Sequence, residues 1–340
     1  MKVTISNAKP GSILAEDLYD QTGRLLLPKG TELDEMNIYM LRKHHIMEIE
    51  IEVASRQIEL ERIRQFQATY EASVDMLKQI VDQAKTSGKI PIEPLIDIST
   101  ILLEEILQDT GIVHQLSRVR NQDEYTFRHL MNVSIYSGML AKWLGLTKQE
   151  QMKLALAGIL HDCGKIFVPN HILNKQGALT DEEQEEMKKH TEYGYQFLMN
   201  NKISEEIALV ALNHHERRDG TGYPKGIRDR HIDFFSRVVA VADVYDAMCS
   251  DRTYQKANSP YHVSEILWEL SYDKMDPQIV LPFIHGICQF FVGDQVVLNT
   301  GETAKVVFVY NDEPTRPLVQ LGNVYMDLRK HRQIKIEKIL

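Results

Sequence analysis

The segment from His214 to Pro224 constrains this chain more than any other, because its paired histidines belong to a larger set of metal-binding residue types. The set contains five histidines and two aspartates: His129, His161, Asp162, His190, His214, His215 and Asp243. Neutral imidazole and carboxylate together suit transition metals such as iron, manganese or zinc. Seven ligands are too many for one ion and suit two. Because paired metals hydrolyse phosphate esters, we expect the chain to fold around a two-metal centre.

The spacing of these residues fits helices that end at the site. His161 and Asp162 are consecutive, just before Gly164, near the end of a predicted helix. Neighbouring helix side chains point about 100° apart, so this pair can touch two ions, and we predict that Asp162 bridges them. A water between two cations loses its proton near neutral pH and becomes the nucleophile. His214 and His215 cannot face one direction on a regular helix, so we expect them at a helix end.

The loop after the paired histidines is a candidate for substrate contact. Asp219, Gly220 and Gly222 belong to a segment rich in turn-forming residues, where backbone can approach a ligand closely. Tyr223 offers a ring for stacking a base and a hydroxyl for a phosphate. An isolated Gly-Tyr-Pro would be an ordinary turn, but its position behind two histidines favours a functional loop.

Two cations near the ligand set are candidates for phosphate contact. Lys165 can meet a phosphate oxygen as a point charge, and Arg252 can do so with two hydrogen bonds. Each alone would be read as a surface cation, and the neighbouring ligands favour the phosphate interpretation. Cys163, beside Asp162, is expected to be a small buried residue, and the isolated His285 is expected to be structural.

Hydrophobic periodicity divides the chain into four regions in a mainly helical protein. We predict a small α+β module at 1–53, a helical linker at 54–114, an all-helical catalytic domain at 115–291 and a small β module at 292–340. Capping-box spacing at Thr147 and Thr180 marks helix starts. Ser259-Pro260 and Asp276-Pro277 each place an N-cap before a proline in the first turn.

A long polar helix is predicted at 55–85. One apolar stripe runs along it, formed by Ile63, Phe66, Tyr70, Val74, Leu77 and Val81. The stripe is explained equally well by packing within the chain or by a homodimer seam. The sequence leaves both interpretations open.

Composition limits the partners of the chain. The formal net charge of −9 argues against non-specific binding to a nucleic acid polymer or to anionic lipid. The N-terminus has no apolar signal core, and no run of residues has the length and apolar character of a membrane span. Three scattered cysteines form no disulfide framework and fit a reducing compartment. We therefore expect a cytoplasmic protein without membrane insertion.

The ligand set resembles that of the HD-GYP subgroup of HD-domain phosphohydrolases. The likeness covers about residues 120–285 and includes His161-Asp162-Cys163-Gly164-Lys165 and Gly222-Tyr223-Pro224. It implies an all-helical HD-type domain and a phosphodiesterase that opens cyclic di-GMP to linear pGpG, and in some members onward to GMP.

The resemblance also implies roles for individual residues. Ligands shared across HD domains correspond to His129, His161, Asp162 and Asp243, with Asp162 as the bridge. Ligands added in the subgroup correspond to His190, His214 and His215. Substrate contacts correspond to Lys165, Tyr223 and Arg252, and the signature loop to Asp219, Gly220 and Gly222.

Two positions depart from the family pattern. Some members hold a third metal with a glutamate at the position of Tyr125, so two divalent ions are expected here, with iron or manganese favoured. The usual Arg-Pro-Tyr-Lys is Arg252-Thr253-Tyr254-Gln255, with Lys256 displaced by one. The missing lysine charge affects substrate affinity and leaves the metal site intact.

Two alternatives accompany the cyclic di-GMP hypothesis. The same chemistry can act on another cyclic dinucleotide, such as cyclic GMP-AMP, since the Gly222-Tyr223-Pro224 loop does not separate one from another. A non-catalytic receptor for cyclic dinucleotides belongs to a different class. Receptors derived from enzymes typically lose ligands, and this sequence keeps all seven, so the enzyme is favoured.

Overall fold

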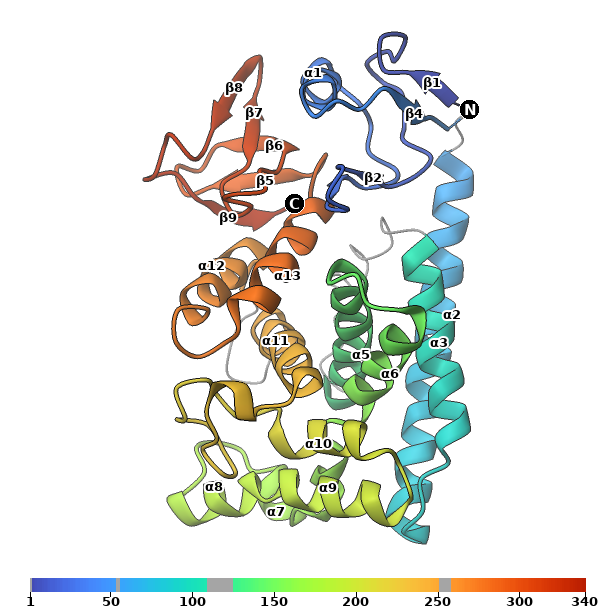
Figure 1. Ribbon diagram of the computed structural model, residues 1–340, viewed down its shortest axis with the longest axis vertical. Coiled ribbons are helices and arrows are strands. Elements are labelled where there is room, and N and C mark those ends of the chain that lie inside the picture. The colour runs from blue at the N-terminus through green and yellow to red at the C-terminus, as the bar shows by residue number, and fades with distance from the viewer. Residues whose placement is uncertain (1, 53–55, 109–124, 251–257) are drawn as a thin grey trace.

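The computed structural model describes residues 2–52, 56–108, 125–250 and 258–340. A helical domain forms the body of the molecule, and both the N-terminal and the C-terminal modules sit at one end of it (Figure 1). Arg252 and the predicted region boundaries near 53 and 114 lie outside the described residues. No helix in these ranges is both long and apolar enough to span a membrane.

The N-terminal module is the predicted small α+β unit. It contains β1 (Lys2–Thr4), β2 (Leu18–Tyr19), β3 (Leu25–Leu27), α1 (Glu35–Lys43) and β4 (Glu48–Glu50). Strand β1 pairs antiparallel with β4, and β2 pairs antiparallel with β3. Asp34 and Asn37 form a reciprocal capping box at the start of α1, which satisfies backbone N–H groups that the first turn leaves unpaired.

The body of the molecule is all-helical, as predicted. Its longer helices are α2 (Arg56–Ser87), α3 (Ile92–Gln108), α5 (Tyr125–Trp143), α6 (Lys148–Leu160), α8 (Asp181–Lys188), α9 (His190–Asn200), α10 (Glu205–Asn213), α11 (Phe234–Cys249), α12 (Pro260–Leu270) and α13 (Pro277–Phe290). Short turns η3 (Cys163–Phe167), α7 (Asn170–Leu173) and η4 (Asp229–His231) connect them. The predicted capping boxes at Thr147 and Thr180 are both formed, and Ser259 and Asp276 cap α12 and α13.

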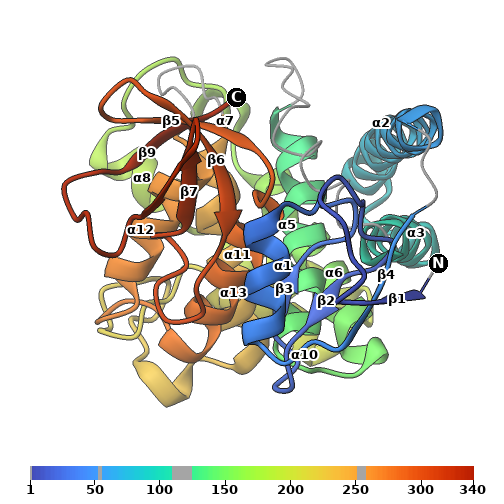
Figure 2. The ribbon, with the colours of Figure 1, turned by 90° about the horizontal axis from the view of Figure 1, so that it is seen from above.

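Helix α2 runs along one side of the helical body beside α3 (Figures 1 and 2). Its apolar stripe is buried within the chain: Phe66, Tyr70, Val74 and Leu77 are each at most 2% exposed. The helix packs on α3 and α5. Packing within the chain therefore accounts for these four residues of the stripe.

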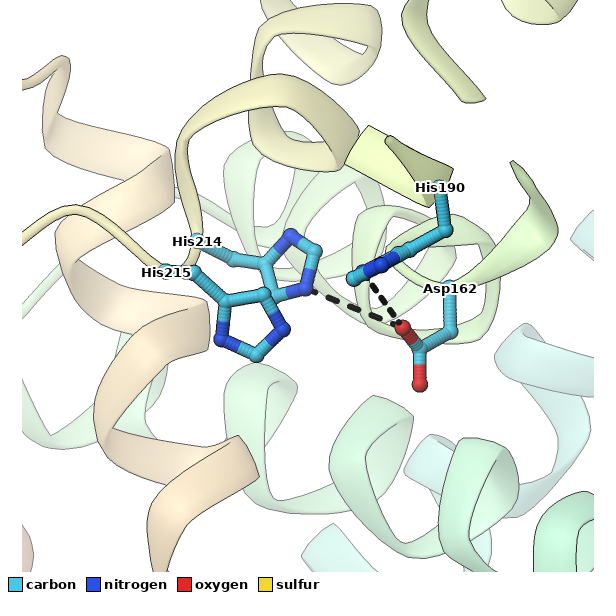
Figure 3. A group of neighbouring side chains, drawn as sticks. All are labelled: Asp162, His190, His214 and His215. Carbon is cyan, nitrogen blue, oxygen red and sulfur yellow. Dashed lines mark ion pairs between the residues drawn. The ribbon is translucent and has the colours of Figure 1, made fainter. Parts of the chain in front are cut away.

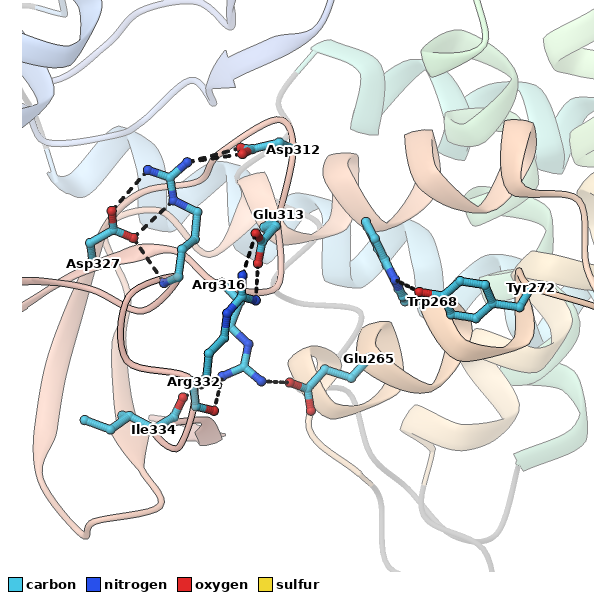
Figure 4. A network of polar contacts seen from close by, with 10 residues as sticks. Glu265, Trp268, Tyr272, Asp312, Glu313, Arg316, Asp327, Arg332 and Ile334 are labelled. Atoms are coloured by element: carbon cyan, nitrogen blue, oxygen red, sulfur yellow. Dashed lines mark hydrogen bonds and ion pairs between the residues drawn. The ribbon is translucent and has the colours of Figure 1, made fainter.

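The C-terminal module is a five-stranded antiparallel sheet. Its strands β5 (Gln295–Leu298), β6 (Thr303–Phe308), β7 (Leu318–Leu321), β8 (Val324–Asp327) and β9 (Ile336–Ile339) lie in the order β8-β7-β6-β5-β9. A small β module was predicted here, and the sheet confirms it. The edge strand β8 is largely exposed and lacks an alternating pattern. Glu265 of α12 forms ion pairs at 3.0 Å with both Arg316 and Lys335, which fastens the sheet to the helical body. Figure 4 shows the pair with Arg316.

Both terminal modules meet the helical body around His285 of α13. The imidazole Nε2 lies 2.6 Å from Asn311 Oδ1, and Asn311 Nδ2 donates to Asp20 at 3.3 Å. A second link joins the modules directly, since Asn37 Nδ2 donates to the Val307 carbonyl at 2.5 Å. Burial lowers the pKa of His285 to about 4, so this histidine is neutral at pH 7, as its expected structural role requires.

Replacing Leu77 by alanine is expected to destabilise the chain by about 2–5 kcal/mol, because the side chain is 1% exposed and its loss leaves a cavity. The adjacent Met76 is 46% exposed, so Met76→Ala serves as the control and is expected to change stability by less than about 0.5 kcal/mol. Urea unfolding at several protein concentrations measures both. A loss in Leu77→Ala that disappears on dilution would indicate a dimer seam and contradict packing within the chain.

The depressed pKa of His285 predicts a loss of stability in acid. The unfolded chain takes up a proton near pH 6.5, while the folded chain does so only near pH 4, so stability falls as pH drops between these values. Between pH 7 and pH 5, the free energy of unfolding of His285→Gln is expected to fall by about 2 kcal/mol less than that of the wild type. The exposed His331→Gln serves as the control in the same urea titrations. An equal loss in wild type and His285→Gln would contradict this assignment.

Candidate metal centre

The seven predicted ligands come together from five places in the helical body. His129 lies in α5, His161 ends α6 and Asp162 follows it, His190 begins α9, His214 ends α10 with His215 next, and Asp243 lies in α11. Six of the seven are buried. They form two groups, Asp162 with His190, His214 and His215, and His129 with His161 and Asp243, each with its ligand atoms within 4.8 Å of one another.

Hydrogen bonds orient four of the five imidazoles. Nδ1 lies 2.7 Å from the Gly158 carbonyl in His161, 2.7 Å from the Met187 carbonyl in His190 and 3.0 Å from the Val210 carbonyl in His214. In His129 it lies 2.7 Å from the carboxylate of Asp246. These partners only accept, so Nδ1 carries a proton in each ring, and Nε2 is the atom that each ring turns toward the centre.

Asp162 lies between the two groups, and its two oxygens face different ones. Figure 3 shows the oxygen that faces His190 and His214. Oδ1 is 3.2 Å from His190 Nε2 and 3.7 Å from His214 Nε2. Oδ2 is 3.3 Å from His161 Nε2. In the second group, Asp243 Oδ1 lies 3.1 Å from His129 Nε2 and 3.8 Å from His161 Nε2. This geometry is what a carboxylate bridge between two cations requires.

The two buried aspartates are anionic. Burial alone would raise the pKa of Asp162, but Lys165 and His161 hold it well below its usual range. Burial opposes ionisation of Asp243 too, but its contacts with His129 and His161 keep its pKa well below the usual range. Burial lowers the pKa of His215 to about 3, so that ring is neutral at pH 7. Carboxylate and neutral imidazole are the ligand forms that transition metals take.

The donor set fits divalent metal ions. His161 Nε2, His190 Nε2, His214 Nε2 and Asp162 Oδ1 are buried and have no hydrogen-bond partner among the described residues. With its proton on Nδ1, each imidazole turns a lone pair toward carboxylate oxygens that also carry only lone pairs. These lone pairs repel one another unless a cation lies between them, and a buried polar atom without a partner is costly.

Gly164 allows the two halves of the site to approach each other. A Cβ at this position would lie 1.9 Å from the His190 carbonyl oxygen and 2.4 Å from the Gly194 nitrogen. Turn η3, which follows Asp162, therefore packs directly on the first turn of α9, and His190 is brought to the carboxylate. The sequence marked Gly164 as part of a motif, but its steric role depends on α9 and was not predicted.

The loop after His215 is folded onto the site by its own backbone. Gly222 packs so closely that a Cβ would lie 2.4 Å from the His215 carbonyl oxygen. The close approach predicted for this glycine is thus made to the chain itself. Tyr223 stacks on the His215 ring with centroids 4.6 Å apart. The exposed Asp219 carboxylate accepts from the backbone N–H and the hydroxyl of Thr221, which closes the turn.

Glu216 is a structural residue of this loop that the sequence analysis did not identify. Its side chain is 3% exposed, and its two carboxylate oxygens accept from the backbone N–H groups of Lys225 at 2.8 Å and Ile227 at 3.1 Å. Arg217 donates to the His214 and Glu216 carbonyls at 3.0 and 2.9 Å. The carboxylate and the guanidinium therefore fix the turn that presents the paired histidines.

Two lysines lie beside the metal-binding groups. Lys165 Nζ is 2.5 Å from Asp162 Oδ2, and its side chain is 31% exposed. Lys188, which was not predicted, places Nζ 5.7 Å from the centre of the Tyr223 ring. Both ammonium groups bring positive charge to a site in a chain of net charge −9.

Comparison with known proteins identifies the helical body. The protein-family model described as HD domain matches residues 102–279. A cyclic di-GMP phosphodiesterase of Pseudomonas aeruginosa is 34% identical over 226 residues, which cover 66% of this chain and 54% of that protein. A 3'3'-cGAMP-specific phosphodiesterase of Vibrio cholerae is 33% identical over 193 residues, which cover 56% of this chain and 44% of that protein. The chain spans about half the length of these curated relatives.

A solved structure shares the fold over a larger part of the chain. An HDG"Y"P protein from Bdellovibrio bacteriovorus aligns with a TM-score of 0.54 and 17% identity, over 83% of this chain and 97% of that one. At this identity the likeness concerns the fold alone.

Replacing Gly164 by alanine is expected to weaken metal binding by about 10- to 100-fold, because the new methyl group separates η3 from α9 and so Asp162 from His190. Metal affinity is measured by competition with a chromophoric chelator. Cys163→Ala adds no atoms at the neighbouring position and is the matched control, with affinity expected to stay near that of the wild type. Undiminished affinity in Gly164→Ala would show that the close approach does not position the ligands.

Proposed function

The chain belongs to the HD domain family, in agreement with the resemblance on which its sequence was interpreted, and we propose that it is a metal-dependent phosphodiesterase that hydrolyses cyclic di-GMP to pGpG, GMP or both. One observation carries the proposal. Five imidazoles and two carboxylates converge in two adjoining groups, with the Nε2 atoms of His161, His190 and His214 buried and unpartnered among the described residues.

The two groups define which residues would hold which ion. One ion would bind His129, His161 and Asp243, the other His190, His214 and His215, with Asp162 shared between them. Bound there, two divalent transition metals would polarise a phosphodiester and lower the pKa of a water that attacks it. Since the chain supplies imidazole and carboxylate in combination, iron and manganese are the ions that we propose.

The chain's own cations and aromatic ring would bind the substrate. Lys165, beside Asp162 and part-exposed, is available to neutralise charge that develops on the phosphate oxygens. Burial raises the pKa of Tyr223, so its hydroxyl remains a hydrogen-bond donor at pH 7. Asp219, Gly220 and Gly222 shape the loop that carries this tyrosine. Arg252 is proposed as a phosphate contact from the sequence resemblance alone.

A second substrate is favoured by one specific comparison. The similarity to a cGAMP-specific phosphodiesterase is close to that found for the cyclic di-GMP enzyme, and the phosphodiester chemistry is the same for both. The two substrates differ only in one base, so the metal centre does not discriminate between them. Cyclic GMP-AMP is therefore the substrate to assay beside cyclic di-GMP.

The cysteines bear on where the protein would work. Cys163 and Cys288 are free thiols. We propose the cytoplasm, because thiols persist in a reducing compartment.

Replacing Asp162 by alanine is expected to abolish turnover and to lower the metal content from two ions per chain to one or none, because both groups lose the same carboxylate. The measurement is chromatography of cyclic di-GMP reactions, with metal counted in the same samples. Asp75→Ala, at an exposed position of α2, is the control and is expected to keep both properties. Full turnover by Asp162→Ala, or wild-type protein with two metals that leaves both dinucleotides intact, would contradict the proposed function.

A further inference from the structure

His129 differs from the other oriented histidines in how its ring is held. His161, His190 and His214 point Nδ1 at backbone carbonyls three or four residues earlier in the chain, so local structure fixes those rings. His129 instead uses the side chain of Asp246, which belongs to a different helix, α11. The orientation of this one ring therefore depends on long-range contacts between side chains.

The partner of His129 is itself held by a chain of hydrogen bonds. Asp246 is 2% exposed; one of its oxygens faces His129 Nδ1 at 2.7 Å, and the other accepts from Asn132 Nδ2 at 2.8 Å. Asn132 Oδ1 in turn accepts from the hydroxyl of Tyr70 at 2.8 Å. The amide has only one orientation that works, because a flipped amide would turn its oxygen toward the carboxylate of Asp246.

Tyr70 brings helix α2 into this chain of hydrogen bonds. The tyrosine is 2% exposed and lies 62 positions before Asn132. Its neighbour Glu71 makes two bonds, 2.9 and 2.6 Å long, to the guanidinium of Arg128, the residue before His129. Helix α2 is thus fastened to α5 at the turn that carries the metal-binding histidine.

We propose that Tyr70, acting through Asn132 and Asp246, is a positioning residue for His129, so that helix α2 forms part of the support of the metal centre. The hydroxyl of Tyr70 fixes the amide, the amide fixes the carboxylate, and the carboxylate fixes both the rotation and the tautomer of the imidazole. Groups that orient a metal-binding histidine change metal affinity when they are removed. This inference rests on the proposed two-metal site.

The hydrogen bonds that run from Tyr70 through Asn132 and Asp246 to His129, here called the relay, connect helix α2 to the metal-binding groups. Strand β4 of the N-terminal module ends at Glu50, and helix α2 begins at Arg56. A shift of α2 relative to α5 would separate the Tyr70 hydroxyl from Asn132 and release the carboxylate of Asp246. A movement of α2 would therefore change the orientation of the His129 ring.

The test uses the full chain loaded with Co²⁺, whose visible absorption reports the ligands around the ion. Tyr70→Phe removes one hydroxyl and keeps the buried ring. We expect Co²⁺ affinity to fall about 3- to 10-fold for one of two ions, the range of a single hydrogen bond, with an altered absorption spectrum. Tyr261→Phe removes another buried hydroxyl, one without a hydrogen-bond partner among the described residues, and is expected to leave affinity and spectrum unchanged.

A double-mutant cycle separates positioning from packing. Asn132→Ala interrupts the relay and is expected to weaken Co²⁺ binding by about 10- to 100-fold. In that background Tyr70→Phe should have little further effect on Co²⁺ affinity, because the amide that connects the Tyr70 hydroxyl to Asp246 is absent. Additive losses, or a Tyr70→Phe protein that matches Tyr261→Phe in affinity and spectrum, would overturn the relay while leaving the metal centre intact. Wild-type chain that binds no Co²⁺ would overturn both the relay and the proposed function.

Discussion

The structure depends on the electrostatic balance around two buried carboxylates, Asp162 and Asp243. An anion inside a helical protein is expensive unless positive charge or strong donors surround it. In this chain the groups that face Asp162 are imidazoles whose protons point away from it, toward backbone carbonyls. Lys165 supplies part of the compensating charge, and cations held between these donors would supply the rest.

Local and long-range structure contribute differently to this balance. Helix ends supply His161, His190 and His214 with carbonyl acceptors from their own turns, which makes these rings rigid without help from elsewhere. Glu216 fixes the turn after His215 through backbone N–H groups. His129 is the exception, since its ring is oriented by Asp246 from α11 and, through Asn132, by Tyr70 from α2. Local backbone thus fixes three of the rings, whereas the orientation of His129 depends on how α2 and α11 pack against α5.

Much of this architecture was predictable from local chemistry. The ligand types suggested two metals, capping boxes marked the starts of α6 and α8, and the apolar stripe identified α2. Features that depend on distant contacts were not predictable from one sequence. Asp246 and Asn132 are 114 positions apart, the steric role of Gly164 appears only once α9 packs beside it, and β8 is an exposed edge strand whose pattern resembles a loop. The stripe of α2 fitted two interpretations, because its packing partners α3 and α5 could not be identified from periodicity alone.

We propose that seven side chains form one site for two metal ions, with Asp162 between them. Anomalous X-ray diffraction from crystals of the manganese- or iron-loaded chain would locate these ions. Two peaks about 3.5–4 Å apart are expected, one beside His129, His161 and Asp243 and the other beside His190, His214 and His215, with Asp162 contacting both. A single peak, or a pair of ions that Asp162 does not bridge, would contradict it.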